Sequence, residues 1–498
     1  MDKVYDVAVI GGGINGCGIA ADAALRGLSV ILCEADDLAS KTSSSSTKLI
    51  HGGLRYLEHF DFSMVKKALQ ERQRLLTLAP HLVKPLELIL PHRKEMRPIW
   101  MLRAGLFIYD HLSFTNKLPR AKYVKRQNNA VLFKPLRDEF NKGFTYYDCT
   151  TDDARLTITN ALQARHHNAT IRTRAKVVTG EIQDSIWKLT LKSSSNSITT
   201  IKAKVVVNAT GPWIESMNQM LGIPILHDMS LVKGSHLLVK KLYDGDHAYF
   251  LQHSDERLIF VIPYHGLTMI GTTEVPCSDP SQCLNVTAEE TTYLLDIVNQ
   301  YFKTSLNNQD IVYSWCGVRP LLAASGKNPD QLSRDYTFEY ATDPAPSITI
   351  YGGKITTYRQ LASEVINALE PIFPNLPQTK TERTPLPGAS IDNLALAEYK
   401  AKARAQYSWV SNETLERLLN TYGTLTEHIL VGKHQEEDLG KQFFKTVYQA
   451  EIDYLMNYEW AKTAEDILWR RTKLGLLMDQ NSQHTLSEYV LRNELITC

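Results

Sequence analysis

The sequence predicts an α/β fold, organised as an α+β mosaic, on three observations. A short apolar strand at the N-terminus runs into a glycine-rich turn and a helical pattern, strand-like segments recur through the middle of the chain, and the residues after 390 read as helices. The chain has 498 residues, which is enough for about three domains. Its 43% hydrophobic and 22% charged residues are typical of a globular protein and exclude disordered and collagen-like classes.

Charge and cysteine usage narrow the range of partners. The 55 Lys and Arg residues balance 54 Asp and Glu residues, so the net charge of +1 provides no general attraction for nucleic acid. The seven cysteines contain no C-x-x-C pair, which argues against a structural zinc site or a redox dithiol. We therefore expect no bound metal and reduced thiols in a cytoplasmic protein. The cysteines are Cys17, Cys33, Cys149, Cys277, Cys283, Cys316 and Cys498.

No segment of the sequence reads as a signal peptide or a membrane span. Asp2 and Asp6 stand where a signal peptide has a basic flank, and the three glycines from Gly11 would break a spanning helix. No window reaches ~18 apolar residues without a charge. Any contact with a membrane is therefore expected to be peripheral.

The first forty residues predict a Rossmann-like dinucleotide-binding unit. Val4–Ile10 reads as a buried strand, the spacing G-x-G-x-x-G follows at Gly11, Gly13 and Gly16, and a helix of small residues leads to a second strand over residues 28–32. Gly11 permits a tight turn, Gly13 removes the Cβ that would block a pyrophosphate, and Gly16 lets helix and strand pack closely. The N–H groups at the start of the helix then bind the phosphates.

An acid and a polar segment follow this unit. Glu34 lies 18 residues beyond Gly16, where a carboxylate is expected to bind a ribose hydroxyl. Glu34 is compatible with FAD or NAD and weighs against NADP, whose additional phosphate it would repel. Residues 41–48 are either a flexible linker or a source of hydroxyls and amides for a flavin. The unusual mixture of glycines, histidines and Arg55 in residues 51–59 favours the flavin.

Motifs spread over the whole chain carry a family resemblance. They are IGGGINGCGIAADAALRG, TSSSSTKLIHGGLRYLEH, VVVNATGPW, LVKGSHLLV, GVRPL, SRDY, GGKITTYR and LWRRTKLG. On these motifs the chain resembles the aerobic, quinone-linked, FAD-dependent glycerol-3-phosphate dehydrogenases of the D-amino-acid-oxidase-like flavoprotein superfamily. The insertion typical of the oxidase branch is missing from the sequence, which favours a dehydrogenase. The resemblance implies that FAD is bound by Gly11, Gly13, Asn15, Gly16, Glu34, Thr42, Ser43, Ser45, Lys48, Leu49, His51, Gly211, Gly353 and Thr356.

The resemblance also implies a discontinuous cofactor domain, and strand patterns support it independently. Residues 204–211 and 347–354 each read as a buried strand that ends in a glycine turn, like the opening strand. We expect a Rossmann-like FAD-binding domain at 1–80, 145–215 and 340–372, an interleaved mixed-sheet substrate (cap) domain at 81–144 and 216–339, a linker at 373–390 and a helical C-terminal domain at 391–498.

Local patterns predict several further elements. Residues 231–239, 258–264 and 267–272 have strand composition, and a hairpin turn is expected at His265-Gly266. In the C-terminal region Ser411 is a predicted helix cap and Gly423 the corresponding stop. Thr463 and Asp466 have the spacing of a capping box.

The resemblance implies oxidation of the C2 hydroxyl of sn-glycerol 3-phosphate to give dihydroxyacetone phosphate, with hydride transfer to FAD. The planar guanidinium of arginine pairs with two phosphate oxygens at once, so cations in matching motifs are candidates for the phosphate clamp. We expect Arg55, Tyr56, Arg334 and Lys354 to bind the substrate. Arg319 and His236 are the catalytic candidates, because a guanidinium stabilises an alkoxide and a neutral imidazole accepts a proton. The sequence leaves open which of the two handles the proton.

The electron acceptor implied by the resemblance is a membrane quinone. Residues 81–112 combine five cations with leucines, isoleucines and aromatics, which suits binding to an anionic membrane surface. The alternative is an amphipathic helix packed on the body of the protein. The expected location is cytoplasmic, peripherally attached to the inner face of the cell membrane, and a homodimer is one candidate assembly.

Two other functions are compatible with the residues. The first is a flavin oxidase or dehydrogenase of an amino or 2-hydroxy acid, in which the arginines would bind a carboxylate. One carboxylate needs one arginine, so four cations argue against it. The second is a dinucleotide-binding interaction protein without turnover, which the same set of cations also argues against.

Overall fold

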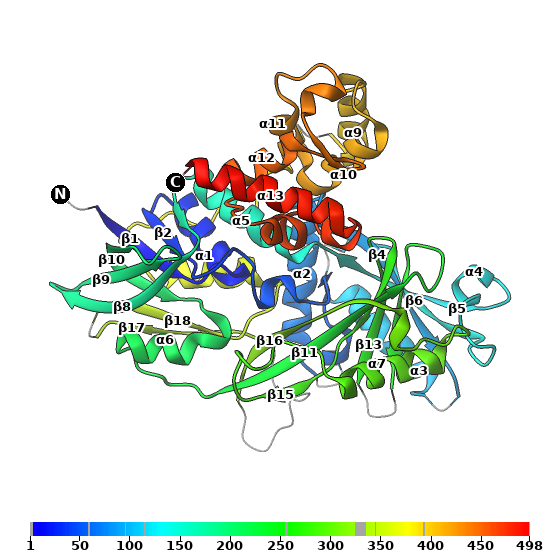
Figure 1. Ribbon diagram of the computed structural model, residues 1–498. Coiled ribbons are helices and arrows are strands. Elements are labelled where there is room, and N and C mark those ends of the chain that lie inside the picture. Colours follow the sequence, from blue (N-terminus) through cyan, green and yellow to red (C-terminus); the bar gives the residue numbers. More distant parts are fainter. Residues whose placement is uncertain are drawn as a thin grey trace.

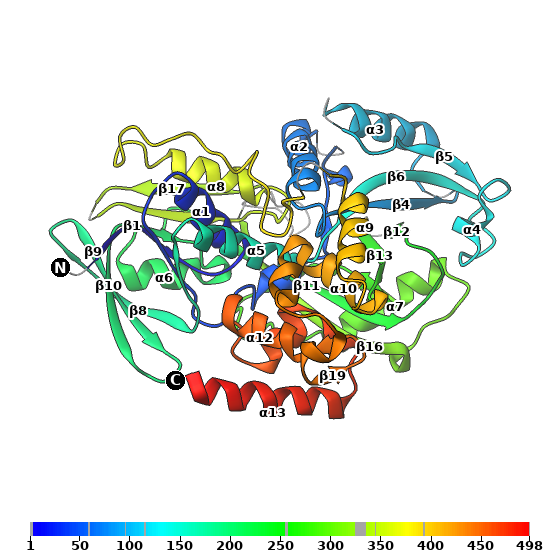
Figure 2. The same ribbon diagram turned by 90° about the horizontal axis from the view of Figure 1, so that it is seen from above.

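The structure, a computed structural model, describes residues 3–57, 60–94, 96–113, 116–253, 257–323, 335–343, 345–391 and 394–497. Two large sheets lie side by side, and a helical C-terminal domain lies over their junction (Figures 1 and 2). The predicted mosaic of a Rossmann-like unit, an interleaved mixed sheet and C-terminal helices is therefore confirmed.

The first sheet is built around parallel strands that are buried on both faces. The N-terminal strand β1 (Val4–Ile10) pairs in parallel with β2 (Val30–Cys33) on one side and β10 (Ile198–Asn208) on the other. Val7 faces Val30 and Val205 across these pairs, and all three are fully buried. The remaining strands are β7 (Thr170–Arg172), β8 (Ala175–Gln183), β9 (Ile186–Ser193), β17 (Thr337–Ala341) and β18 (Ser347–Tyr351).

The second sheet is mostly antiparallel. Its longest pair joins β11 (Met229–Lys240) to β16 (Ile311–Leu322). The expected hairpin is present as β13 (Leu258–Tyr264) and β14 (Leu267–Gly271), whose turn residues His265 and Gly266 both have positive φ. The other strands are β3 (Leu49–Ile50), β4 (Lys84–His92), β5 (Lys122–Lys125), β6 (Lys142–Thr150), β12 (Ala248–Gln252) and β15 (Val275–Cys277). The domain boundaries remain a prediction, and the one at residue 145 falls inside β6.

Helices cover both sheets. The helix after the glycine turn, α1 (Ile14–Leu25), packs against α5 (Asp153–His166) and α8 (Tyr358–Asn367). A large apolar core joins these helices to the C-terminal domain. The other helices of this part are α2 (Phe62–Leu78), α3 (Ile99–His111), α4 (Ala130–Phe133), α6 (Ile214–Leu221) and α7 (Ala288–Tyr301).

The C-terminal domain contains the predicted caps. Ser411 Oγ accepts the N–H of Thr414 at the start of α10 (Asn412–Tyr422), and the helix ends at Gly423. Thr463 and Asp466 form the reciprocal bonds of a capping box before a π-helical turn at Asp466–Arg471. The other elements are α9 (Leu396–Gln406), α11 (Thr426–Leu430), β19 (Gln442–Phe444), β20 (Val447–Tyr448), α12 (Gln449–Tyr458) and α13 (Gln480–Thr497).

Two expectations need correction. The segment 81–112 is not a single surface element, because its first half forms the largely buried strand β4 between β6 and β12, whereas exposed side chains occur from Lys94 onward and along one face of α3. Cys277 and Cys283 form a disulfide instead of two thiols, and a spacing of six residues gave no signal for it. Within the described residues, no helix combines the length and the hydropathy needed to cross a bilayer.

His81 is a buried histidine that packs where the C-terminal domain contacts the rest of the protein. Its ring fills the space beside Gly388 and Gly423, and burial, together with the charges of Arg155 and Lys84, lowers its pKa to about 3. Histidine in the unfolded chain binds a proton below about pH 6.5. The unfolded state therefore binds more protons between these two pKa values, and stability falls as the pH falls through this window.

We expect His81→Asn to lower the Tm at pH 7 through lost packing and to show a smaller further decrease in Tm between pH 7 and pH 5 than the wild type. Thermal unfolding monitored by circular dichroism measures both effects. His484→Asn is the matched control, because the His484 side chain is 76% exposed. A decrease between pH 7 and pH 5 as large in His81→Asn as in the wild type would contradict this prediction.

Candidate active site

The carboxyl ends of the parallel strands bring three glycine turns together. Gly11 follows β1 with φ +113°, and a Cβ at this position would lie 2.5 Å from the carbonyl oxygen of Ala209, which follows β10. Gly211 lies in the next turn along the sheet, with φ +61° and open space where a side chain would be. Gly353 follows β18 with φ +108°. Only glycine fits the first of these turns, because φ and the close approach both exclude a side chain.

The start of α1 is open to an anion. Gly13 is the N-cap and contributes no side-chain hydrogen bond, and the first turn contains no acidic residue. Ser43 Oγ accepts the N–H of Ile14 at 2.9 Å. A Cβ at Gly16 would collide with the carbonyl of Gly11, so this glycine permits the close packing of helix and turn.

Glu34 lies at the end of β2, next to the glycine turn. Its two carboxylate oxygens accept the backbone N–H groups of Gly12 at 2.6 Å and Asp36 at 2.8 Å. Burial raises the pKa of Glu34, while these hydrogen bonds oppose the shift. The carboxylate is thus fixed beside the turn, as its predicted contact with a ribose hydroxyl requires.

The serine-rich segment joins the two sheets. Thr42 Oγ1 donates to the carbonyl of Val318 in β16 at 2.7 Å, and Ser45 packs against Gly317 of the same strand. Lys48 is buried, and its ammonium group donates to Asp153 at 2.8 Å and to the carbonyl of Ser44. The ammonium therefore makes an internal ion pair that fixes the shape of the segment.

More of the predicted cofactor contacts meet between the first and last segments of the cofactor domain. The N–H of His51 donates to Thr356 Oγ1 at 3.2 Å, just after the buried Leu49 in β3. Asn15 Nδ2 donates to the carbonyl of Gly352 at 3.2 Å, and a Cβ at Gly353 would lie 2.8 Å from this amide nitrogen. Residues from both ends of the cofactor domain thus converge on one place.

Arg319 projects from β16 over the face of the second sheet. Its guanidinium lies on Gly234 of β11, where a Cβ would be 2.5 Å from Nη2. Nη2 donates to Thr272 Oγ1 at 3.1 Å, while Nη1 is buried and has no hydrogen-bond partner among the described residues. Burial lowers the pKa of Arg319, and the Tyr56 hydroxyl opposes the shift. An arginine still remains protonated in this setting.

His236 is adjacent and fully buried. Its ring is nearly parallel to that of Trp315 (centroids 5.3 Å apart, 12° between planes), and its Nε2 lies 3.0 Å from Thr47 Oγ1. Burial, followed by the charges of Arg319 and Lys48, holds the pKa of His236 well below its usual range. The imidazole is therefore neutral at physiological pH.

The structure describes two of the four predicted substrate-binding side chains, Lys354 and Tyr56. Lys354 Nζ lies 4.0 Å above the centre of the Tyr56 ring and 3.0 Å from Met64 Sδ. Tyr56 also lies close enough to Arg319 to oppose the lowering of the Arg319 pKa, and we call Lys354, Tyr56 and Arg319 the cationic cluster. Arg334 and the side chain of Arg55 lie outside the described residues.

These groups fit an FAD. The open helix N-terminus and the hydroxyls of the serine-rich segment provide donors for the pyrophosphate, Glu34 provides an acceptor for a ribose, and the open space above Gly211 leaves room for the cofactor. The sequence did not reveal Thr272 or Trp315, because strand register alone brings them to Arg319 and His236. Thr47 lies in the serine-rich segment that the sequence indicates as a flavin contact.

Comparison with known proteins agrees with this cofactor. Residues 6–359 match the family described as FAD dependent oxidoreductase, and residues 379–491 match the C-terminal domain of alpha-glycerophosphate oxidase. A glycerol-3-phosphate dehydrogenase of Pseudomonas aeruginosa is 46% identical over 98% of this chain and 96% of its own. A D-erythritol 1-phosphate dehydrogenase of Brucella abortus is 42% identical over 98% of each chain.

A solved structure is similar along the whole length. The glycerol-3-phosphate dehydrogenase from Bacillus halodurans, crystallised with FAD, superimposes with a TM-score of 0.75 at 27% identity and covers 99% of this chain and 95% of its own. On these matches, the protein is an FAD-dependent oxidoreductase and belongs to the family of FAD-dependent glycerol-3-phosphate dehydrogenases.

Proposed function

We propose that the protein oxidises sn-glycerol 3-phosphate to dihydroxyacetone phosphate and passes the electrons to a membrane quinone. The observation that carries this proposal is the position of the cationic cluster: Lys354 directly follows the glycine turn after β18, and Tyr56 connects it to Arg319. The names of the relatives support a phosphorylated polyol as the substrate. D-Erythritol 1-phosphate is the second candidate, because the relative named for it is almost as similar.

Each residue of the site has a separate proposed task. Lys354, with Arg55 and Arg334 from the matching motifs, binds the phosphate, and Tyr56 aligns the polyol. Bound FAD would accept a hydride from C2. Arg319 stabilises the negative charge on the C2 oxygen, because its Nη1 is buried and needs an acceptor. His236 is neutral and so has a lone pair for the hydroxyl proton, although its lowered pKa makes it a weak base. Its alternative task is to hold Thr47 in place through Nε2.

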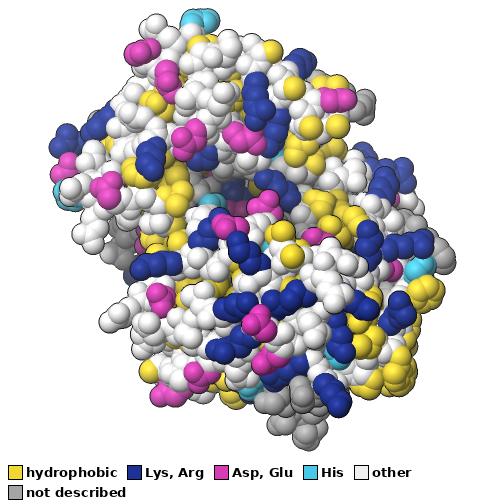
Figure 3. All heavy atoms as spheres, turned by 90° about the vertical axis from the view of Figure 1, so that its right-hand side faces the viewer, with side chains coloured by type: hydrophobic (Ala, Val, Ile, Leu, Met, Phe, Trp, Pro, Cys, Tyr) yellow, Lys and Arg dark blue, Asp and Glu magenta, His cyan; other side chains and the backbone are white. Residues whose placement is uncertain are grey.

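The exposed face of α3 supports attachment to a membrane. Trp100, Met101 and Phe107 are exposed on this helix (72%, 45% and 62%), and cations precede it at Arg93 and Lys94. Figure 3 shows the side of the molecule toward which this region lies, where hydrophobic and basic side chains occur next to each other. Basic groups bind anionic headgroups while aromatic side chains enter the interface. We propose that this face holds the enzyme at the inner surface of the cell membrane.

We expect purified protein to contain a yellow flavin whose absorbance is bleached by sn-glycerol 3-phosphate under anaerobic conditions. The cationic cluster binds a phosphate dianion, so amino acids and 2-hydroxy acids should leave the spectrum unchanged. D-Erythritol 1-phosphate is tested in parallel, and faster bleaching by this compound would make it the substrate. Bleaching by an amino acid alone would contradict the proposed function.

We expect Arg319→Met to reduce the rate of flavin reduction by about 10² to 10³, because one preorganised donor at a developing oxyanion contributes that much. Stopped-flow absorbance at saturating substrate measures this rate. Arg383→Met is the matched control, since the Arg383 side chain is 87% exposed, and its rate should change by less than about twofold. A variant at Arg319 with an unchanged rate would remove this residue from the proposed chemistry.

We expect the double substitution Trp100→Ser and Phe107→Ser to reduce co-sedimentation with anionic vesicles by more than about tenfold, since a buried aromatic side chain contributes about 2 kcal/mol. Added salt should weaken binding of the wild type, because headgroup attraction is screened. Val431→Ser serves as control, as Val431 is 70% exposed on the C-terminal domain. Binding that is insensitive to both changes would refute the assignment of this surface.

A further inference from the structure

The LWRRTKLG motif of the C-terminal domain has no task in the function proposed above. In the structure the two arginines of this motif, Arg470 and Arg471, both form ion pairs with the carboxylate of Asp37 in the cofactor domain. Arg471 donates to both oxygens of Asp37, at 2.5 and 2.8 Å, and Arg470 Nε donates to the same carboxylate at 2.6 Å. The side chains of Arg471 and Asp37 are 0% and 2% exposed, so this ion pair is removed from water.

Asp37 belongs to the loop that shapes the dinucleotide-binding turn. It lies three residues after Glu34, whose carboxylate accepts the N–H of Gly12. On the other side of Asp37, the N–H of Ala39 donates to the carbonyl of Gly12 at 3.0 Å. Both the donor and the acceptor of Gly12 are therefore bonded to the loop on either side of Asp37. A shift of Asp37 would move Glu34 and the glycine turn together.

A second ion pair connects the same two segments. Asp466, at the start of the π-helical turn, accepts from Arg174 Nη2 at 2.6 Å, and the N–H of Arg174 donates to the carbonyl of Asp36 at 2.7 Å. Burial alone would raise the pKa of Asp466, but the charges of Arg174, Arg471 and Arg470 and the hydrogen bond from Lys462 lower it to about 2. The carboxylate therefore stays ionised and bound to Arg174 across the physiological range.

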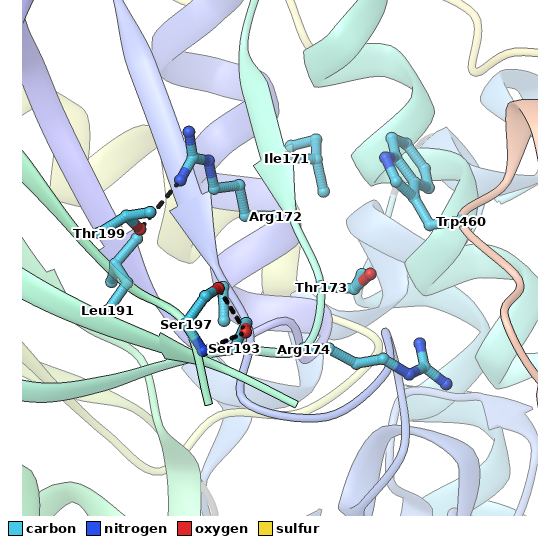
Figure 4. Close-up of a pocket in the computed structure, with 10 residues that line it drawn as sticks. Ile171, Arg172, Thr173, Arg174, Leu191, Ser193, Ser197, Thr199 and Trp460 are labelled. Carbon is cyan, nitrogen blue, oxygen red and sulfur yellow. Dashed lines mark hydrogen bonds between the residues drawn. The ribbon is translucent and has the colours of Figure 1, made fainter. Parts of the chain in front are cut away.

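An open cavity lies beside Arg174, next to these ion pairs. This cavity, of about 340 Å³, lies between the end of β7, the β9–β10 hairpin and Trp460 (Figure 4). In Figure 4 the guanidinium of Arg174 points away from that of Arg172, which bonds to Thr199 instead. Arg174 thus connects the C-terminal segment to the loop at the edge of this cavity.

We propose that Arg470 and Arg471 are positioning residues for FAD: by holding Asp37, the C-terminal domain fixes the Glu34 loop and the glycine turn against the adenosine half of the cofactor. Arg471 is fully buried and acts on the loop through Asp37. Loss of Asp37 leaves the buried guanidinium of Arg471 without its carboxylate, and loss of Arg471 leaves Asp37 with Arg470 as its remaining charged partner. In either case the loop moves toward water to hydrate the buried charge. The inference rests on the assignment of this turn to FAD and is independent of the substrate.

The test measures FAD affinity without catalysis. Apoprotein of the full-length chain is titrated with FAD and, separately, with riboflavin, and the quenching of flavin fluorescence gives each Kd. We expect Arg471→Met and Asp37→Asn each to raise the Kd for FAD about tenfold or more and to leave the Kd for riboflavin within about twofold, because riboflavin lacks the adenosine half. The Kd of the double variant for FAD should be no higher than that of either single variant, because both substitutions remove the same interaction.

The matched control breaks a comparable ion pair that does not reach the loop. Arg417 donates to both carboxylate oxygens of Glu451, at 2.7 and 2.5 Å, inside the C-terminal domain. Arg417→Met should lower the Tm like Arg471→Met but leave the Kd for FAD within about twofold. If Arg471→Met yields no folded protein, Asp37→Asn provides the same comparison, since it keeps the size of the side chain.

Three results would overturn the inference. An FAD affinity in Arg471→Met and Asp37→Asn that changes no more than in Arg417→Met would show that the pair serves stability alone. An equal loss of riboflavin and FAD affinity would show that the effect is not directed at the adenosine half. A wild-type chain that binds no FAD would refute the cofactor site itself, whereas failure with sn-glycerol 3-phosphate would leave this result intact.

Discussion

The whole site depends on parallel strand pairing in the first sheet. β1 pairs with β2 and β10, and β10 pairs in turn with β18. Parallel strands end at the same edge of a sheet, so the chain must turn at Gly11, Gly211 and Gly353 in one place. The approach of Gly11 to the carbonyl of Ala209 leaves no room for any side chain there. This constraint exposes the N-terminus of α1, and the donors of that helix then become available to a phosphate.

In the second sheet, the strand register determines which candidate catalytic side chains lie on the same face. In the pairing of β11 with β16, His236 stands opposite Trp315 and Val232 opposite Arg319, so His236, Gly234, Trp315 and Arg319 share one face of the sheet. Gly234 and Gly271 have no side chain, which lets the guanidinium of Arg319 and the ring of His236 lie flat on the strands. A slip of one residue would turn all of these groups to the opposite face.

Much of this could be predicted from the sequence where local rules decide. β1 and β13 have the predicted bounds, and the caps at Ser411 and Thr463 form as expected, because strand composition and capping depend on neighbouring residues. The roles of the site residues stay predictions, and Arg334 and the side chain of Arg55 lie outside the described residues. The structure of residues 81–112 could not be predicted correctly, because β4 and α3 both combine apolar with basic residues. The pairing of β4 with β6, which buries β4, cannot be read from that composition. The disulfide of Cys277 and the contact of Arg471 with Asp37 depend on tertiary proximity, which no pattern in the chain encodes.

The discontinuity of the first sheet has a consequence for biosynthesis. β1 and β2 are made first, but β10, which flanks β1 on its other side, ends only at residue 208, and β18, which pairs with β10, ends only at residue 351. Until the ribosome has delivered each of these strands, the edge of the growing sheet lacks its partner, and distant parallel pairing is slow. Insertion of the cofactor must therefore wait for most of translation, and a nascent chain interrupted before residue 351 would have an open sheet edge prone to aggregation.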